Sequence, residues 1–361
     1  MKHLIIIIFS VLLIGCGKNN ANDVTKLEGA PAPFDGSKKL HFALIRQALE
    51  GEFLQMWQTG SQKQADLMGI KLTVLGKNMD NQAQADFIYQ AINMKVDGII
   101  LDNGFAETLT EPINEAVKLG IPVVAVEVNI PNPEINRITL DNYSLAKNSL
   151  DAMVKDYNQK ANIGYVYLSG QPSLDARDEA FTDLKNQFPN MKEVARSGTL
   201  ESPFAVKNAE QVKAVLKANP QINAYFAPFD EFAKGVVLAL EEEGLTDKVR
   251  VYSIDISTQD IELMIKEGSP WVATATANPT QAGALCVRAL ALKVAGEPIP
   301  QNILIESHLF TQDMLRKAGV KNMEELEIKF PDFNKTTNMT ASCIPMIKEN
   351  FYYRLIYRCF L

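Results

Sequence analysis

The chain has 361 residues, of which 47% are hydrophobic and 22% are charged, a composition typical of a globular protein rather than a disordered one. Because single hydrophobic cores stop growing at about 250–300 residues, this length predicts two domains. The net charge of −7 and the absence of a long basic block argue against a phosphate-binding surface, so no nucleic acid partner is expected.

The first sixteen residues have the pattern of a lipoprotein signal peptide. A short basic start, Met1-Lys2-His3, precedes an almost continuously apolar run over residues 4–14. This run is shorter than the roughly 20 residues that cross a bilayer, and it suits the apolar region of a secretion signal. It ends in Leu13-Ile14-Gly15-Cys16, which resembles a bacterial lipobox. That resemblance implies cleavage before Cys16, lipidation of its thiol, and a membrane-anchored protein in the periplasm or on the cell surface. An uncleaved or a soluble secreted form is the alternative.

Residues 17–38 are rich in Asn, Asp, Gly, Ala and Pro and predict a flexible tether. Apolar β-rich runs then alternate with segments of helical periodicity. Runs without polar alternation are typical of a parallel sheet that is covered on both faces. Gly69 and Gly120 follow two of the expected helices, where a left-handed residue commonly ends a helix. We expect strands at 40–45, 72–75, 98–101 and 122–126, and helices at 53–68, 84–94 and 109–119.

A second series of the same kind follows Asp141-Asn142. Repeated βα units predict one doubly wound parallel sheet in each of two similar lobes, and therefore an α/β fold. The expected helices are 145–157, 179–188, 205–216, 232–243 and 259–266, and the expected strands are 163–168, 194–195, 224–227, 249–254 and 272–277.

The remaining elements are too few for a third domain and are expected to return to the two lobes. They are a helix at 279–294, a strand at 303–305 and a helix at 312–318. The expected division is 39–141 plus 278–305 for the N-terminal lobe and 142–277 plus 306–332 for the C-terminal lobe. Residues 333–361 form an atypical aromatic and basic tail to which no function is assigned.

Signatures of catalysis and of metal binding are missing. The sequence has no GxxxxGK[ST], HExxH or GxSxG motif. Because these motifs are absent, we expect no enzyme activity, no cofactor and no metal. Whether Cys343 and Cys359 form a disulfide is left open. The histidines and cysteines have neither zinc nor CxxC spacing; they are His3, His41 and His308, and Cys16, Cys286, Cys343 and Cys359.

Polar side chains follow several of the expected strands. In open α/β sheets, ligands bind beyond the carboxyl ends of the strands. Carboxylates accept hydroxyl hydrogens and guanidinium groups donate in pairs, so these groups suit a polyhydroxylated ligand. Capping of helices or shaping of turns is an equally good interpretation for most of them, with Arg177 and Asp255 as exceptions. The candidates are Arg46, Gln47, Asp102, Asn103, Glu127, Asn129, Asp230 and Asp255 at strand ends, and Arg177 at a helix start.

Several short sequence segments, in their order along the chain, resemble those of the periplasmic sugar-binding proteins of the ribose and galactose type over roughly residues 40–332. The resemblance implies two lobes joined by three crossings, near residues 141–142, 277–278 and 305–306, that close on a sugar. The pieces that carry it, after the lipobox and tether, are Phe42-Ala43-Leu44-Ile45, Val96-Asp97-Gly98-Ile99-Ile100, Gly120-Ile121-Pro122-Val123-Val124, Asp141-Asn142, Arg177-Asp178-Glu179-Ala180-Phe181, Phe229-Asp230-Glu231, Ile254-Asp255 and residues 275–279.

Carried over by position, the resemblance implies contacts to the sugar. Arg177 and Asp255 fall on residues that bind sugar oxygens. Phe53, with Leu54 or Trp57 beside it, falls on an aromatic residue that stacks on the ring. Core packing is the equally weighted interpretation of Phe53, because aromatic residues mostly fill cores.

The chain also departs from that family. Glu127-Val128 stands where the family often has Asp-Arg, and Phe229-Asp230 where it often has Asn-Asp. A frequent glutamine falls on Ala277, with Asn278 next to it. Because Phe229 offers a flat apolar face in place of an amide, or else packs in a core, we expect a related but different ligand, such as a cyclitol, a sugar alcohol or a modified sugar.

The expected function is therefore that of a monomeric, extracytoplasmic solute-binding protein. It would capture a sugar or polyol by hinge closure and deliver it to the membrane permease of an ABC importer. A ligand sensor that presents its closed form to a chemoreceptor or kinase is the alternative. An enzyme acting on a sugar or nucleotide is less well supported, because a secretion signal disfavours cofactor-dependent cytoplasmic chemistry. A sugar-responsive repressor would need a DNA-binding motif where this chain has its signal peptide.

Overall fold

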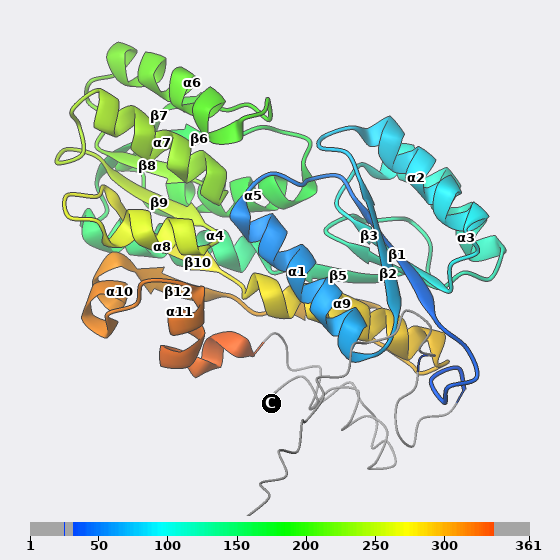
Figure 1. Cartoon of the computed structure of the whole chain (residues 1–361). Helices are drawn as coiled ribbons and strands as arrows, with labels where there is room; N and C mark the ends of the chain where they lie inside the picture. The colour runs from blue at the N-terminus through cyan, green and yellow to red at the C-terminus, as the bar shows by residue number, and fades with distance from the viewer. Residues whose placement is uncertain (1–24, 26–31, 336–361) are drawn as a thin grey trace, which may run out of the picture.

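The computed structural model describes Thr25 and residues 32–335. They form two α/β lobes, each built around one six-stranded sheet (Figure 1). In the first lobe the strand order is β11-β5-β4-β3-β1-β2, and every pair is parallel. The strands are β1 (His41–Arg46), β2 (Lys71–Gly76), β3 (Gly98–Asp102), β4 (Val123–Val126), β5 (Asn136–Leu140) and β11 (Asn302–Ile305).

The second sheet has the order β12-β10-β9-β8-β6-β7. Its pairs are parallel except that β12 runs antiparallel to β10 at the edge. The predicted fold of two similar parallel-sheet lobes is confirmed, and the antiparallel edge strand is an addition to it. The strands are β6 (Ala161–Val166), β7 (Met191–Ser197), β8 (Ala224–Ala227), β9 (Arg250–Ile254), β10 (Trp271–Thr276) and β12 (His308–Thr311).

Helices cover both faces of each sheet (Figure 1). In the first lobe they are α1 (Glu52–Leu67), α2 (Asn81–Asn93), α3 (Ala106–Lys118) and α9 (Pro279–Val294). In the second lobe they are α4 (Asn142–Asp156), α5 (Pro172–Gln187), α6 (Phe204–Ala218), α7 (Asp230–Glu242), α8 (Thr258–Ile265), α10 (Gln312–Ala318), α11 (Met323–Lys329) and the 3₁₀ turn η1 (Pro331–Asn334).

The strands are apolar on both sides because helices pack against both faces of each sheet. Successive side chains of a strand point to opposite faces. In β3, Ile100 packs into the core shared with α1 and α9, whereas Ile99 and Leu101 pack into the core shared with α2 and α3. A strand buried on both faces has no polar alternation, which is the pattern that the sequence shows.

The chain passes from one sheet to the other three times: between β5 and α4, between β10 and α9, and between β11 and β12. The first two crossings are helix starts. The Asp141 side chain accepts a hydrogen bond from the Ser144 N–H, and the Asn278 side chain accepts one from the Gln281 N–H. At two of the three crossings, a polar side chain of the connecting segment thus caps the next helix.

Residues 1–24, 26–31 and 336–361 are not described. The predicted signal peptide, Cys16, and the cysteines Cys343 and Cys359 lie among them. No helix in the described part of the chain is both long and apolar enough to span a bilayer.

Candidate ligand-binding cleft

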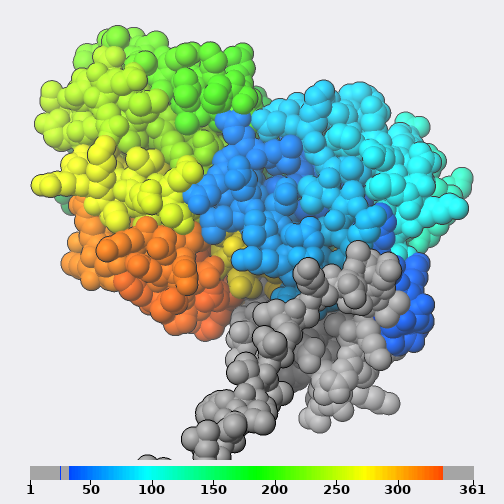
Figure 2. All heavy atoms as spheres, viewed as in Figure 1, coloured from blue at the N-terminus to red at the C-terminus, as the bar shows by residue number. Residues whose placement is uncertain are grey.

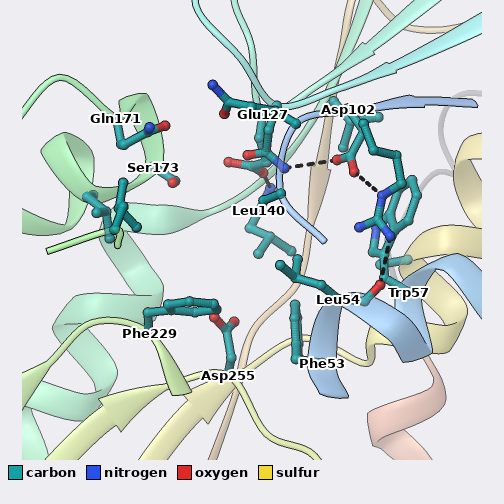
Figure 3. A pocket seen from close by; sticks show the side chains of 18 of the residues that line it. Phe53, Leu54, Trp57, Asp102, Glu127, Leu140, Gln171, Ser173, Phe229 and Asp255 are labelled. Carbon is teal, nitrogen blue, oxygen red and sulfur yellow. Dashed lines mark hydrogen bonds and ion pairs between the residues drawn. The ribbon is translucent and has the colours of Figure 1, made fainter. Parts of the chain in front are cut away.

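A cavity of about 120 Å³ lies where the two lobes meet. Figure 2 shows the lobes in contact along one side of the molecule, and Figure 3 shows the cavity from close by. Its wall is built from both lobes and from the crossings between them. The residues predicted from the sequence that line it are Arg46, Gln47, Phe53, Trp57, Asp102, Asn103, Glu127, Arg177, Phe229 and Asp255.

Arg46 and Asp102 form the polar wall of the first lobe. They end the neighbouring strands β1 and β3 and are partners in the ladder register. The Arg46 Nε donates to Asp102 Oδ2 at 2.7 Å, and its Nη1 donates to the Leu54 carbonyl at 3.0 Å. The guanidinium also lies 5.1 Å from the centre of the Trp57 ring. Its Nη2 has no partner among the described residues, so a ligand oxygen can accept from it.

A chain of polar contacts continues through the hinge to the second lobe. Glu127, after β4, accepts a hydrogen bond from Asn142 Nδ2 at 2.7 Å. Asn142 Oδ1 accepts from Arg177 Nε at 2.9 Å. Arg177 Nη1 then lies 3.7 Å from Asp255 Oδ2. Two carboxylates of opposite lobes are therefore linked through one arginine and one hinge amide.

Burial disfavours the charged form of these carboxyl groups. Loss of hydration raises the pKa of Asp255 to about 6, although the nearby Arg177 opposes the shift. Loss of hydration also raises the pKa of Glu127 and of Asp102, with Arg46 acting in the opposite direction on Asp102. Asp255 Oδ1 has no partner within the described residues. A hydroxyl group of a ligand would supply the hydrogen bond that this oxygen lacks.

Three of the strand-end residues have left-handed backbones. Asn103, Glu127 and Asp255 have φ values of 58°, 56° and 76°. Such conformations are uncommon for residues other than glycine, and they concentrate at ligand-binding sites. Each residue directly follows a strand, so the left-handed turn directs its side chain away from the pleat of the sheet.

The opposite side of the cleft carries aromatic rings, with the Asp255 carboxylate beside them (Figure 3). Phe53 comes from the first turn of α1, and Phe229 immediately precedes α7. In Figure 3 these two rings lie on the opposite side of the cavity from Asp102 and Glu127. Phe204, at the start of α6, packs edge-on against Phe229 with ring centres 6.2 Å apart. Further lining residues that the sequence did not predict are Leu174, Leu200, Phe204, Gln171 and Ser173.

Three predicted residues do not line the cleft. Asn129 is exposed, although its neighbours Val128 and Ile130 are buried in the core of the first lobe. Asp230 is fully buried and faces Lys234, whose Nζ lies 3.5 Å from its Oδ2. Asn278 caps α9 and donates to Glu327 Oε1 at 2.9 Å. In the last two cases, neighbouring side chains hold the polar group away from the cavity.

No cluster of three or more potential metal ligands occurs in the part of the chain that the structure describes. Cys286 is buried in α9 and unpaired.

Comparison with known proteins identifies the family. A model of the periplasmic binding protein domain matches residues 42–298. The D-apiose import binding protein of Paraburkholderia graminis is 27% identical, covering 58% of this chain and 67% of its own length. The ribose import binding protein of Escherichia coli K12 is also 27% identical, covering 71% and 86%.

Two solved structures are more similar in sequence. The 5-methylthioribose transporter solute-binding protein of Thermotoga lettingae, in complex with 5-methylthioribose, is 34% identical with a TM-score of 0.80, covering 81% of this chain and 93% of that one. A sugar ABC transporter protein of Yersinia enterocolitica is 32% identical with a TM-score of 0.78, covering 82% and 92%. These relatives are binding components of transporters rather than enzymes. The chain belongs to the periplasmic binding protein family and is a sugar-binding protein of an ABC importer.

Proposed function

We propose that the ligand is a sugar with one hydroxylated end and one small apolar end. The observation that carries this proposal is that the rings of Phe53 and Phe229 lie across the cavity from Asp102 and Glu127, with Asp255 beside the rings (Figure 3). A sugar that is hydroxylated all round would leave some of its hydroxyl groups against the rings without hydrogen bonds, which is unfavourable.

The hydroxylated end would face the buried charges. Arg46 and Arg177 would donate to ring or hydroxyl oxygens, while Asp102, Glu127 and Asp255 would accept from hydroxyl groups. Arg46 Nη2 and Asp255 Oδ1, which have no hydrogen-bond partner in the described part of the chain, support this orientation. Each hydrogen bond to a charged group contributes about 1.5–3 kcal/mol.

The apolar end would lie against Phe204, Phe229 and Leu200. The Thermotoga lettingae relative binds 5-methylthioribose, in which a methylthio group stands at one end of a pentose. A thioether beside aromatic rings gains about 0.3–1.5 kcal/mol. We therefore take pentoses with a small apolar substituent at C5 as the ligand class, with 5-methylthioribose as the first member to test.

Isothermal titration calorimetry of the purified protein tests the ligand class. 5-Methylthioribose is expected to bind at least about tenfold more tightly than D-ribose, because burial of the substituent contributes about 1.5 kcal/mol. D-Xylose and allitol serve as fully hydroxylated comparisons. Equal or tighter binding of D-ribose would contradict the apolar end of the site. Tight binding of allitol alone would replace the pentose with a sugar alcohol.

We also propose how the protein is placed and divided. The lipobox supports a mature chain anchored through acyl groups on Cys16 on the outer side of a membrane, acting there as a monomer without enzyme activity. We assign residues 39–141 with 278–305 to the first lobe and 142–277 with 306–332 to the second, because the strands and helices in each set build one sheet and its cover.

A further inference from the structure

Two glutamates reach from the first lobe to the second outside the cavity. The Glu50 carboxylate, in the segment between β1 and α1, accepts hydrogen bonds from the Phe204 N–H and the Ser202 hydroxyl, each at 2.5 Å. Glu52 Oε2, in the first turn of α1, accepts from the Gln259 N–H at 2.8 Å. All three donors belong to the second lobe, and neither glutamate lines the cavity.

These contacts fall on helix ends that need acceptors. The first N–H groups of a helix have no acceptor within the helix, and they carry the positive end of its dipole. Helix α6 begins after Pro203, which offers no side-chain cap. Glu50 supplies that cap from the other lobe. Helix α8 has its own cap in Ser257, which accepts from the Asp260 N–H, and Glu52 adds a second acceptor at Gln259.

Gly51 lets the lobes approach closely at the same place. Its φ of 105° favours glycine, and a Cβ there would lie 3.0 Å from Glu231 Cγ in the second lobe. Glu231 cannot easily move aside, because Lys234 Nζ holds its Oε1 at 2.7 Å. The segment of residues 50–52 therefore meets the starts of α6, α7 and α8 together.

We propose that Glu50, Gly51 and Glu52 form a clasp that stabilises the closed lobes independently of contacts to the ligand. Glu50 is also a positioning residue for the aromatic side of the cleft, since the backbone that it holds is that of Phe204, whose ring lines the cleft. The inference rests on the proposed function only in taking closure as the step that retains the sugar.

Hydrogen exchange of the ligand-free protein, followed by mass spectrometry, tests the clasp through its distant effects. Glu50→Ala is expected to speed exchange at Gln259 at least about threefold, although the acceptor of that amide, Glu52, is intact. Glu52→Ala is expected to speed exchange at Phe204 in the same way. If each variant changes only the amide that it contacts, the two glutamates are separate caps and the clasp does not exist.

Gly51→Ala retains both carboxylates, but its added methyl group would separate the lobes. It is therefore expected to speed exchange at both Phe204 and Gln259. Glu50→Gln retains an acceptor oxygen without the charge and is expected to fall between the wild type and Glu50→Ala. Glu107→Ala is the matched control, because Glu107 is an exposed glutamate in the first turn of α3 of the first lobe. It is expected to match the wild type.

Stopped-flow dissociation of 5-methylthioribose provides the second readout. Glu50→Ala and Glu52→Ala are each expected to raise the dissociation rate about tenfold with little change in the association rate, as is usual for contacts that hold a formed complex. An unchanged dissociation rate would overturn the clasp. If the wild type does not bind this sugar, the ligand proposal fails, and the exchange measurement still decides on the clasp.

Discussion

Phe229 lies where the aromatic side of the cleft meets the start of α7. Its ring packs edge-on against Phe204 and against Phe232, with ring centres 6.2 Å and 5.3 Å away. It therefore presents a fixed aromatic face to the cavity. Because both neighbouring rings are also anchored in helices, this face is part of the scaffold of the second lobe and not a mobile side chain on its surface.

Phe229→Ala is expected to weaken binding of 5-methylthioribose about tenfold, since the substituent loses an aromatic neighbour. Binding of D-ribose is expected to change by less than about threefold. Calorimetric titration with both sugars measures the difference, with Val206→Ala, an exposed position on α6, as the control. An equal loss for both sugars would mean that Phe229 contacts the pentose ring itself.

Asp255 makes the stability of the ligand-free protein depend on pH. Its pKa is raised from 3.8 to about 6 by burial, so between these values the folded protein holds a proton that the unfolded chain has released. The stabilisation is fully present below pH 3.8 and is lost as the pH rises through about 6. Asp255→Asn is expected to flatten the fall in melting temperature between pH 4 and pH 6. Part of this dependence of the melting temperature on pH is expected to remain in the variant, because burial also raises the pKa values of Asp102 and Glu127. A slope identical to that of the wild type would contradict this assignment.

The expectation that ligands bind beyond the carboxyl ends of strands predicts the charged residues of the cleft from the sequence, but not the apolar ones. Arg46 and Asp102 end neighbouring parallel strands of the first sheet, and Asp255 follows a parallel strand of the second, so each lies at the carboxyl edge of its own sheet. Leu200 and Phe204 reach the cleft from a loop and a helix start, for which no periodicity gives a direction. Asp230 does not line the cavity, because its carboxylate is buried in the core near Lys234, one helical turn away.

At the scale of elements, α1 and α9 pack more closely than ordinary helices. A Cβ on Gly60 would lie 2.0 Å from the Thr280 carbonyl oxygen, and one on Gly283 would lie 1.9 Å from the Trp57 carbonyl oxygen. Ser61 Oγ donates to the Gly283 carbonyl at 3.0 Å across the same contact. Since α1 carries Phe53 and Trp57, this contact also fixes part of the cleft wall.

Gly60→Ala is expected to lower the free energy of unfolding by about 1–3 kcal/mol, because the added methyl group separates two packed backbones. Urea denaturation measures the change. Thr59→Ala is the control on the same helix, since Thr59 is exposed, and it is expected to remain within about 0.5 kcal/mol of the wild type. A neutral Gly60→Ala would show that the helices can move apart without loss.

The elements that the sequence predicted best are those with strong local signals. Helix α9 begins with Pro279, and Gly319, which has a φ of 63°, directly follows α10; both helices have the predicted bounds. Strands β5 and β12 were missed. β5 contains three polar residues in five, Asn136, Arg137 and Thr139, and it is a strand because β4 and β11 pair with it on either side. That pairing depends on a segment far along the chain, so no local pattern reveals it.

At the scale of the whole molecule, Cys16→Ser tests the proposed anchor. The wild-type protein is expected to separate into the detergent phase when Triton X-114 extracts of the producing cells are warmed, because several acyl chains hold a protein in a micelle. The variant is expected to remain in the aqueous phase or to keep its signal peptide uncleaved, which intact mass spectrometry distinguishes. Detergent partitioning of a correctly cleaved variant would contradict lipidation at Cys16.

The late return of the chain to both lobes bears on when the protein can fold. Leu285 and Leu290 of α9 fill the same core as Leu44 and Ile100, so one face of the first sheet stays open until that helix has been made. The core of the second lobe is likewise incomplete until Phe310, Leu315 and Leu326 have been made. Contacts between residues so far apart in sequence form slowly. Neither lobe can therefore complete its core before these late segments have been made, so a partly synthesised chain has no finished fold.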